Sequence, residues 1–178
     1  METLQIKDKK FAVSIPEAEI LKQVKRVAGE INRDLVGSEP VFLAILNGSF
    51  IFAADLMREI ELSAQISFVK LASYVGTSST GSVCEMIGLN VDISGRDVVV
   101  VEDIVDSGLT MKYVTEMLAK YNPRSISICT LLLKPGNLKV DLDIPYKCFS
   151  IPNDFILGYG LDYDGYGRNT RDIYTVVE

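Results

Sequence analysis

The chain has 178 residues, of which 48% are hydrophobic and 24% are charged, so disorder is not indicated and one compact domain is expected. Its net charge of −6 argues against nucleic acid as the main partner, because a basic face is what neutralises phosphate. Histidine is absent. This excludes Ser/His/Asp catalysis and leaves proton transfer to carboxylates, Lys, Tyr or water.

The cysteines and the apolar runs bear on the compartment. Cys84, Cys129 and Cys148 are widely spaced and form no C-x-x-C pair, which predicts free thiols in a reducing environment. The first residues contain no long apolar stretch, and the longest apolar runs have the length of strands. We therefore expect no signal peptide, no membrane partner and a cytoplasmic protein.

The first half of the chain predicts a helix and two strands around a second helix. Ser14 stands three residues before Glu17, which is a capping-box pattern, and apolar residues then recur at helical spacing over 17–35. The elements expected next are a buried strand at 40–46, a helix at 50–61, a strand at 65–74 and a loop at 75–83.

The second half continues the alternation, which predicts an α/β fold with a central, mostly parallel sheet flanked by helices. Ligands of such sheets bind beyond the carboxyl ends of the strands. The predicted elements are a strand followed by a turn at Ser94 and Gly95, a buried strand at 98–101, a helix at 110–122 with Tyr121 on its apolar face, a strand at 125–134, and two shorter strands near the C-terminus.

The stretch "VVVVEDIVDSGLT" (98–110) carries the chemistry. Backbone amides and a helix N-terminus after the strand form a ready anion site, to which Ser107 and Thr110 add hydroxyl groups. Gly108 lets a ligand approach the backbone closely. The glycine spacing fits neither a Walker A loop nor a dinucleotide fingerprint, so we expect a single terminal phosphate to bind here.

Three carboxylates surround the same turn. We expect Glu102 and Asp103 just outside the strand end, beside the phosphate, with Asp106 in the turn itself. Such like charges need a ribose diol and a divalent cation between them, and Mg²⁺ suits oxygen ligands of this kind. The alternative is that these acidic residues only cap a helix and face solvent.

This acidic turn resembles the phosphoribosyl-pyrophosphate motif of the type I phosphoribosyltransferases. The similarity extends over "LAILNGSFIFAADLMR", "LASYVGTSSTG", "NPRSISICTLLLKP" and "IPNDFILGYGLDYDGYGRN", and the last segment is similar to the enzymes that act on hypoxanthine and guanine. The resemblance implies one domain over 1–178, with a small hood formed by the terminal segments, about 1–15 and 145–178. It also implies a homodimer or homotetramer that uses Mg²⁺ to transfer 5-phosphoribosyl to the purine, giving IMP or GMP and pyrophosphate.

The resemblance assigns roles to the residues of the donor site. Asp106 would act as general base on the purine N7 proton, Glu102 and Asp103 would face the ribose hydroxyls, and Glu102, Asp103 and Asp162 would hold metal. The residues implied to bind phosphoribosyl pyrophosphate are Leu46, Asn47, Gly48, Ser73, Tyr74, Glu102, Asp103, Asp106, Ser107, Gly108, Leu109, Thr110 and Arg168.

The resemblance also implies a purine site. Lys134 would donate to the 6-oxo group, Phe155 would stack on the base, Ile156 would read the ring edge, and Asp162 would also belong to the purine-binding residues. Without the resemblance, Lys134 would be read as a solvated lysine at a strand end and Phe155 as a core residue.

Two positions depart from the family pattern. Relatives commonly have Lys or Arg in place of Asn47, next to an unusual cis peptide, and often a polar residue in place of Leu109. Asn47–Gly48 is also a strong turn dipeptide by itself.

The polar loop that Ser73 and Tyr74 lead would close over the site. The alternatives are a pyrimidine- or xanthine-preferring relative, a regulatory protein that binds nucleic acid, and a non-catalytic ligand binder.

Overall fold

The computed structural model describes the backbone of residues 3–75 and 82–177, and the side chains of the same ranges except 73–75 and 82–85. The helices are α1 (Glu17–Asp34), α2 (Phe50–Arg58), α3 (Leu109–Ala119) and the short 3-10 helix η1 (Pro135–Asn137). The strands are β1 (Thr3–Ile6), β2 (Lys9–Ile15), β3 (Val41–Leu46), β4 (Gln65–Val75), β5 (Ser82–Ile87), β6 (Asp97–Val105), β7 (Ser125–Leu133), β8 (Tyr146–Ser150), β9 (Ile156–Leu157) and β10 (Ile173–Val176).

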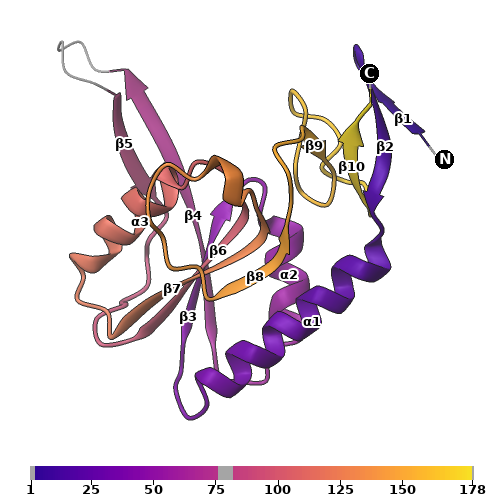
Figure 1. Cartoon of the computed structure of the whole chain (residues 1–178). Coiled ribbons are helices and arrows are strands. Elements are labelled where there is room, and N and C mark those ends of the chain that lie inside the picture. Colours follow the sequence, from indigo (N-terminus) through magenta and orange to yellow (C-terminus); the bar gives the residue numbers. More distant parts are fainter. Residues whose placement is uncertain (1–2, 76–81, 178) are drawn as a thin grey trace.

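The larger sheet has the order β5-β4-β3-β6-β7-β8. All of its neighbouring strands run parallel except β4 and β5, which are antiparallel. Helices α1 and α2 cover one face and α3 the other (Figure 1). The prediction of a mostly parallel sheet flanked by helices is therefore confirmed.

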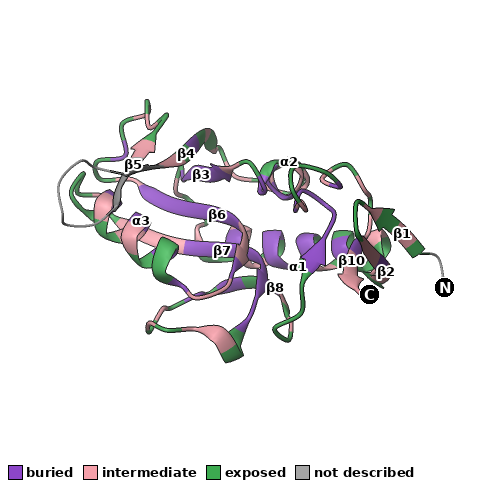
Figure 2. Ribbon diagram, turned by 90° about the horizontal axis from the view of Figure 1, so that it is seen from above, coloured by how far each residue is buried: buried purple, intermediate pink, exposed green. Residues whose placement is uncertain are grey.

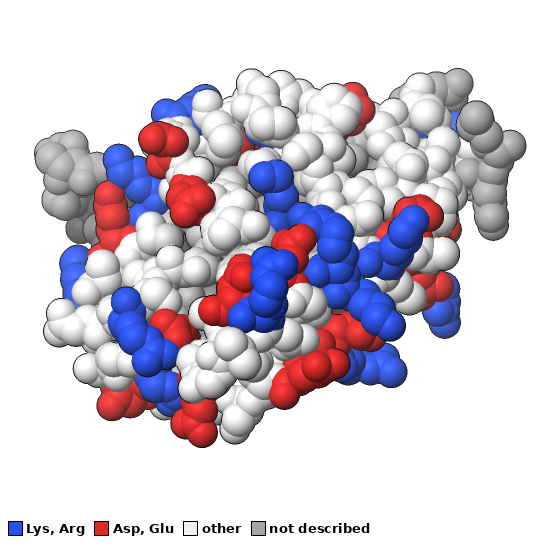
Figure 3. All heavy atoms as spheres, turned by 60° about the horizontal axis from the view of Figure 1, so that its bottom comes forward, with Lys and Arg blue, Asp and Glu red and all other residues white. Residues whose placement is uncertain are grey.

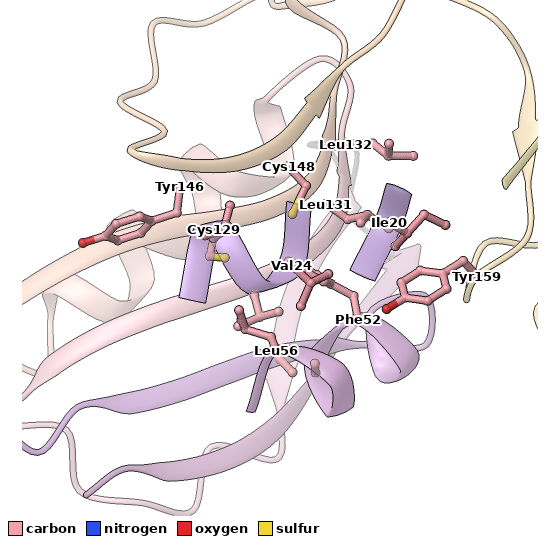
Figure 4. Close-up of a cluster of buried hydrophobic side chains, with 14 of the residues drawn as sticks. Ile20, Val24, Phe52, Leu56, Cys129, Leu131, Leu132, Tyr146, Cys148 and Tyr159 are labelled. Carbon is pink, nitrogen blue, oxygen red and sulfur yellow. The ribbon is translucent and has the colours of Figure 1, made fainter. Parts of the chain in front are cut away.

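The central strands are buried on both faces because each face carries its own apolar cluster. Phe42 of β3 and Val99 of β6 face α1 and α2, whereas the adjacent Leu43 and Val100 face α3. Figure 2 shows β6 buried along most of its length, and Figure 4 shows how side chains of α1, α2 and the sheet meet in the first cluster. This packing fixes the carboxyl ends of β3, β6 and β7 relative to one another.

A smaller sheet, in the order β1-β2-β10-β9, brings the two ends of the chain together beside the larger sheet (Figure 1). Strand β8 lies within the range 145–178 but pairs with β7 in the larger sheet. The assignment of the smaller sheet as the hood of a single domain stays a proposal. None of the helices described in the structure is long and apolar enough to cross a membrane.

The capping-box prediction for α1 is wrong. The Ser14 hydroxyl donates to the carbonyl of Ile173 in β10, and Pro16 occupies the cap position of the helix. The Glu17 amide instead donates to Oδ1 of Asp172 at 2.7 Å. The helix is thus capped by a residue 155 positions away, because β10 lies next to the residues that precede α1.

Two predicted helices are shorter in the structure. Helix α2 ends at Arg58 rather than at 61, and α3 ends at Ala119 rather than at 122. Tyr121 therefore lies beyond α3 and is 52% exposed, so its predicted place on the apolar face is wrong. The backbone turns at Asn122, whose φ is positive, before Pro123.

Candidate active site

Strand β6 continues past the acidic pair. Glu102 pairs with Thr130 of β7, and the ladder runs on to Val105 opposite Leu133. The prediction that Glu102 and Asp103 lie just outside the strand end is therefore wrong, because β7 extends far enough to pair with β6 through Val105. The two carboxylates are carried by strand β6, and both residues line the same pocket beside the turn.

Glu102 is buried, and burial together with the adjacent charge of Asp103 raises the pKa of Glu102 well above its usual value. The Asp103 amide donates to Oε1 of Glu102 at 3.1 Å, and the Ile104 amide donates to Oδ1 of Asp103 at 2.8 Å. Two carboxylates this close favour a cation or a hydroxyl-rich ligand beside them.

The turn after β6 forms a pocket of about 140 Å³. Gly108, with a φ of +81°, caps α3, which begins at Leu109. The amides at this helix N-terminus and the hydroxyl of Thr110 are groups that bind anions. The Leu109 side chain is 52% exposed. The pocket is lined by Glu102, Asp103, Ile104, Val105, Asp106, Ser107, Gly108, Thr110 and Met111.

The segment after β7 packs against this turn. The Lys134 amide donates to the Val105 carbonyl at 3.0 Å, and the Lys139 amide donates to the Ser107 carbonyl at 2.9 Å. A methyl group on Gly108 would press on the side chains of this segment, which explains the glycine there. Those side chains are Leu138, Val140 and Leu142.

Asp106 is held by two donors from the same segment. Lys134 Nζ lies 3.3 Å from Oδ2 of Asp106, and the Asn137 amide donates to Oδ1. The Asn137 hydrogen bond and, after it, the Lys134 ammonium keep the pKa of Asp106 below its usual value despite partial burial. Lys134 is only 9% exposed, so it is not the solvated strand-end lysine of the alternative interpretation.

The structure thus adds Asn137, which sequence reasoning missed. The residue stands three positions after Lys134 in "KPGN", where Pro, Gly and Asn indicate only a turn. No local pattern indicated a partner for Asp106, because the contact joins residues 31 positions apart.

The loop after β3 lies against the acidic pair. The Leu46–Asn47 peptide is cis, as the resemblance implies, and the Asn47 side chain is exposed. Gly48 is buried, and a methyl group there would collide with Oδ2 of Asp103. The absence of a side chain at Gly48 is what allows β3 and β6 to bring this loop and Asp103 together.

The C-terminal loop, residues 158–172 between β9 and β10, contacts the loop after β3. A methyl group on Gly160 would collide with the carbonyl oxygen of Gly48, so the two backbones are in close contact. Arg168 donates to the Gly160 carbonyl at 2.7 Å and forms an ion pair with Asp162, also at 2.7 Å. Asp162, Arg168, Gly48 and Asp103 thus belong to one continuous region.

The aromatic part of the predicted purine site lies near the smaller sheet. Phe155 is 44% exposed, so it is not the core residue of the alternative interpretation. Its ring lies 6.2 Å from that of Phe11 and 5.6 Å from that of Tyr163, measured between centroids. The buried Ile156 pairs with Thr175 in the ladder of β9 and β10. Lys134 thus follows a strand of the larger sheet, whereas Phe155 precedes a strand of the smaller sheet.

The predicted lid falls largely outside the described residues, at 76–81. Ser73 and Tyr74 belong to the backbone ladder of β4 with β5, and their side chains also lie outside the described part of the chain. A larger pocket of about 460 Å³ lies between α1 and α2, and none of the predicted site residues lines it.

Comparison with known proteins agrees with this geometry. The phosphoribosyl transferase domain family matches residues 16–164. The hypoxanthine phosphoribosyltransferase of Salmonella typhimurium is 44% identical over 154 residues, which are 85% of this chain and 86% of that protein. The hypoxanthine-guanine phosphoribosyltransferase of Aquifex aeolicus is 37% identical over 98% of this chain and 99% of its own length.

A solved structure is similar over nearly the whole fold. The hypoxanthine-guanine phosphoribosyltransferase of Bacillus anthracis superposes with a TM-score of 0.86 at 40% identity, covering 93% of this chain and 98% of that one. The acidic turn, the matching family and these relatives all indicate a phosphoribosyltransferase. The chain therefore belongs to the type I phosphoribosyltransferase family, within the group of the hypoxanthine and hypoxanthine-guanine enzymes.

Proposed function

We propose that this protein is a purine-salvage enzyme that transfers the 5-phosphoribosyl group of phosphoribosyl pyrophosphate to hypoxanthine, and also to guanine. The products are IMP or GMP and pyrophosphate. The relatives named above carry this activity in their names.

One observation carries the proposal at the level of chemistry. Lys134 Nζ and Asp106 Oδ2 are 3.3 Å apart at the edge of the phosphate pocket. They present one hydrogen-bond donor and one acceptor side by side. A 6-oxopurine presents the complementary pair, since its O6 accepts a hydrogen bond and its neighbouring N7–H donates one.

The remaining residues would handle the donor. The amides and hydroxyls of 106–110 would bind the 5-phosphate, and Asn47, Gly48 and Arg168 would contact pyrophosphate. Bond breaking at C1′ leads the attack and leaves positive charge on the ribose. Glu102 and Asp103 would stabilise that charge while their carboxylates face the ribose hydroxyls.

The residues present fit a magnesium ion. Mg²⁺ usually binds through one or two carboxylates and keeps waters and substrate oxygens as its other ligands. Glu102 and Asp103 supply two carboxylates, and the described residues contain no cluster of three protein ligands that would make a closed metal site. Asp162 would reach a second ion near pyrophosphate. The metal would neutralise the diphosphate of the donor, and the chain's own residues would orient it.

We further propose a homodimer or homotetramer in the cytoplasm. Ile66, Phe68 and Lys70 are each two residues apart on β4 and therefore share one face of the strand. Ile87 of β5 pairs with Lys70, so its side chain lies on the same face of the sheet. All three apolar side chains are exposed, which supports contact with another copy of the chain. Sedimentation equilibrium of the wild-type protein measures the state directly, and a monomer would contradict it.

A nucleic-acid-binding role has less support. The net charge is −6, and Figure 3 shows basic and acidic side chains interspersed on the face it presents. Nucleic-acid binders instead gather Lys and Arg into a patch or stripe.

A direct assay tests the proposed function. The protein is incubated with phosphoribosyl pyrophosphate, MgCl₂ and hypoxanthine, guanine, xanthine or uracil separately, and nucleotide formation is followed by absorbance and chromatography. We expect IMP and GMP, and loss of both products when EDTA removes the metal. Binding of phosphoribosyl pyrophosphate without nucleotide from any base would identify a non-catalytic binder instead.

A further inference from the structure

Asp106 has an asymmetric environment that the proposed reaction does not by itself require. Its two carboxylate oxygens are bound by different kinds of group: the neutral amide of Asn137 donates to Oδ1, and the charged Lys134 lies 3.3 Å from Oδ2. An amide can donate a hydrogen bond without giving up a proton. Oδ1 is therefore occupied while the carboxylate keeps its negative charge.

Asn137 is well placed to hold this geometry because its backbone is fixed on both sides. The Lys134 amide is bonded to Val105, and the Lys139 amide is bonded to Ser107. The backbone N–H of Asn137 in turn donates to the Lys134 carbonyl at 3.1 Å, which closes η1. The side chain is thus presented from a turn that is anchored to the same loop that carries Asp106.

The packing around Gly108 restricts the segment further. The side chains of Leu138, Val140 and Leu142 crowd the space beside that glycine. Movement of the segment away from Asp106 would break two backbone hydrogen bonds and expose this apolar contact. A donor held this firmly keeps its acceptor in one rotamer, which is the preorganisation that an efficient proton transfer needs.

We propose that Asn137 is a positioning residue that anchors Oδ1 of Asp106, so that Oδ2, beside Lys134, is the oxygen that accepts the proton of the purine. The inference rests on the proposed function. In the transfer, N9 of the base forms a bond to C1′, and the C1′–O bond breaks with its electron pair leaving on pyrophosphate. The N7–H proton passes to Oδ2, and the electron pair of that N–H bond stays in the purine ring.

The three residues would then have separate roles. Lys134 would recognise O6 of the base, Asp106 would take the proton, and Asn137 would contact only Asp106. Loss of Asn137 should therefore slow the chemical step without weakening the binding of phosphoribosyl pyrophosphate, whose phosphate pocket is lined by other residues.

The test uses Asn137→Ala and Asn137→Ser in single-turnover reactions with saturating phosphoribosyl pyrophosphate and Mg²⁺, and in steady-state reactions in which the concentration of phosphoribosyl pyrophosphate is varied. We expect Asn137→Ala to lower the rate of IMP formation about ten-fold, with KM for the donor within about two-fold of the wild-type value. Asn137→Ser keeps a short donor and should recover part of the rate. Asn32→Ala is the matched control, since the Asn32 side chain joins α1 to the backbone of residues 59 and 61, away from the pocket.

A second substrate separates positioning from a merely structural effect. In 8-azahypoxanthine the extra ring nitrogen makes the transferred proton more acidic, so the reaction depends less on the base. We expect the Asn137→Ala deficit to shrink with this analogue. A deficit of equal size for both bases, an unchanged rate with hypoxanthine, or a loss confined to KM for the donor would each overturn the proposal.

Thermal melts of all variants and the wild-type rate complete the design. A lower melting temperature for Asn137→Ala does not mimic the expected result, because a less stable enzyme would lose activity equally with hypoxanthine and with 8-azahypoxanthine. The wild-type rate is measured before any variant is compared. Absence of IMP formation by the wild-type protein would overturn the proposed function itself.

Discussion

Asp106 shows how single residues at this site are tuned by partners distant in the sequence. Its carboxylate is bound by Asn137 and Lys134, which lie 31 and 28 positions further along the chain. Both partners lower the pKa of Asp106, so the carboxylate remains ionised throughout the neutral range. An ionised carboxylate is the form that can accept a proton.

Replacement of the proposed base is the first prediction at this scale. Asp106→Asn keeps the shape of the side chain but cannot accept the purine proton. We expect IMP formation to fall on the order of 100-fold or more, with the Kd for phosphoribosyl pyrophosphate changed by less than about three-fold. Rapid-quench kinetics and calorimetric titration measure the two quantities. Full activity would mean that another group takes the proton.

Lys134 supports a second prediction. Hydrogen bonds to charged groups contribute about 1.5 to 3 kcal/mol, which corresponds to roughly 10- to 100-fold in affinity. Lys134→Ala should therefore raise KM for hypoxanthine by roughly this factor and leave KM for phosphoribosyl pyrophosphate nearly unchanged. An equal rise in both constants would show that Lys134 acts on the donor as well.

At the scale of elements, the amino ends of β6 and β7 are joined by an ionic cluster. Asp97 of β6 accepts hydrogen bonds from Arg124 and, at 2.6 Å, from Ser125 of β7. Arg124 in particular lowers the pKa of Asp97 to about 2. The cluster lies at the opposite end of these strands from the acidic turn, so its role is to stabilise the fold.

The depressed pKa gives a prediction for stability against pH. A carboxylate whose pKa is lowered by folding stabilises the protein above its unfolded value of 3.8, and this contribution is lost as the pH falls towards 2. Asp97→Asn should lower the free energy of unfolding by about 1 to 2 kcal/mol at pH 7. The difference from wild type should shrink below pH 4 in urea titrations. A constant difference would contradict this assignment, and the exposed Asp143→Asn serves as the control.

The contact between two loops supports a further prediction. Gly160 has a φ of +104° and its Cα faces the carbonyl of Gly48, whereas Gly165, with a φ of +85°, faces open space. Gly160→Ala should lower the free energy of unfolding by about 2 to 5 kcal/mol and raise KM for phosphoribosyl pyrophosphate. Gly165→Ala, the matched control, should cost about 1 to 2 kcal/mol from backbone strain alone. Equal effects would mean that the two loops are not in contact.

At the scale of the whole molecule, two polar contacts bind the C-terminal segment to helices α1 and α2. Tyr159 is buried, and its hydroxyl donates to Oδ2 of Asp55 in α2. Burial, and then this hydrogen bond, raises the pKa of Tyr159 well above its usual value. Asp172 caps α1 through the Glu17 amide. The C-terminal loop, and with it Arg168, is thereby held next to Gly48.

Tyr159→Phe tests this attachment because it removes only the hydroxyl. We expect a loss of about 1 to 2 kcal/mol in the free energy of unfolding, since the Asp55 carboxylate loses a donor in a half-buried place. The comparison is with Tyr121→Phe, whose hydroxyl belongs to an exposed side chain and should change stability by less than about 0.5 kcal/mol. Chemical denaturation of both variants measures the difference, and a neutral Tyr159→Phe would show that the contact contributes nothing.

The sequence by itself determined the class of fold and most elements of the larger sheet, but it did not predict strands β1, β2 and β10 of the smaller sheet. The helical spacing of apolar residues predicted α1 to within one residue, and the valine run at 98–101 predicted a strand buried on both faces. The pattern of carboxylates and small residues at 102–110 indicated the chemistry of the site. These signals are local, since periodicity and turn residues act over a few neighbouring positions.

Only the tertiary structure decided which residues act together. The end of β6 depends on how far β7 pairs with it, the cap of α1 comes from Asp172, and the partner of Asp106 is Asn137. Each of these contacts joins segments that meet only when the two sheets and the helices of the described residues have packed. Their energies arise from burial and geometry between distant residues, which no local pattern of sequence encodes.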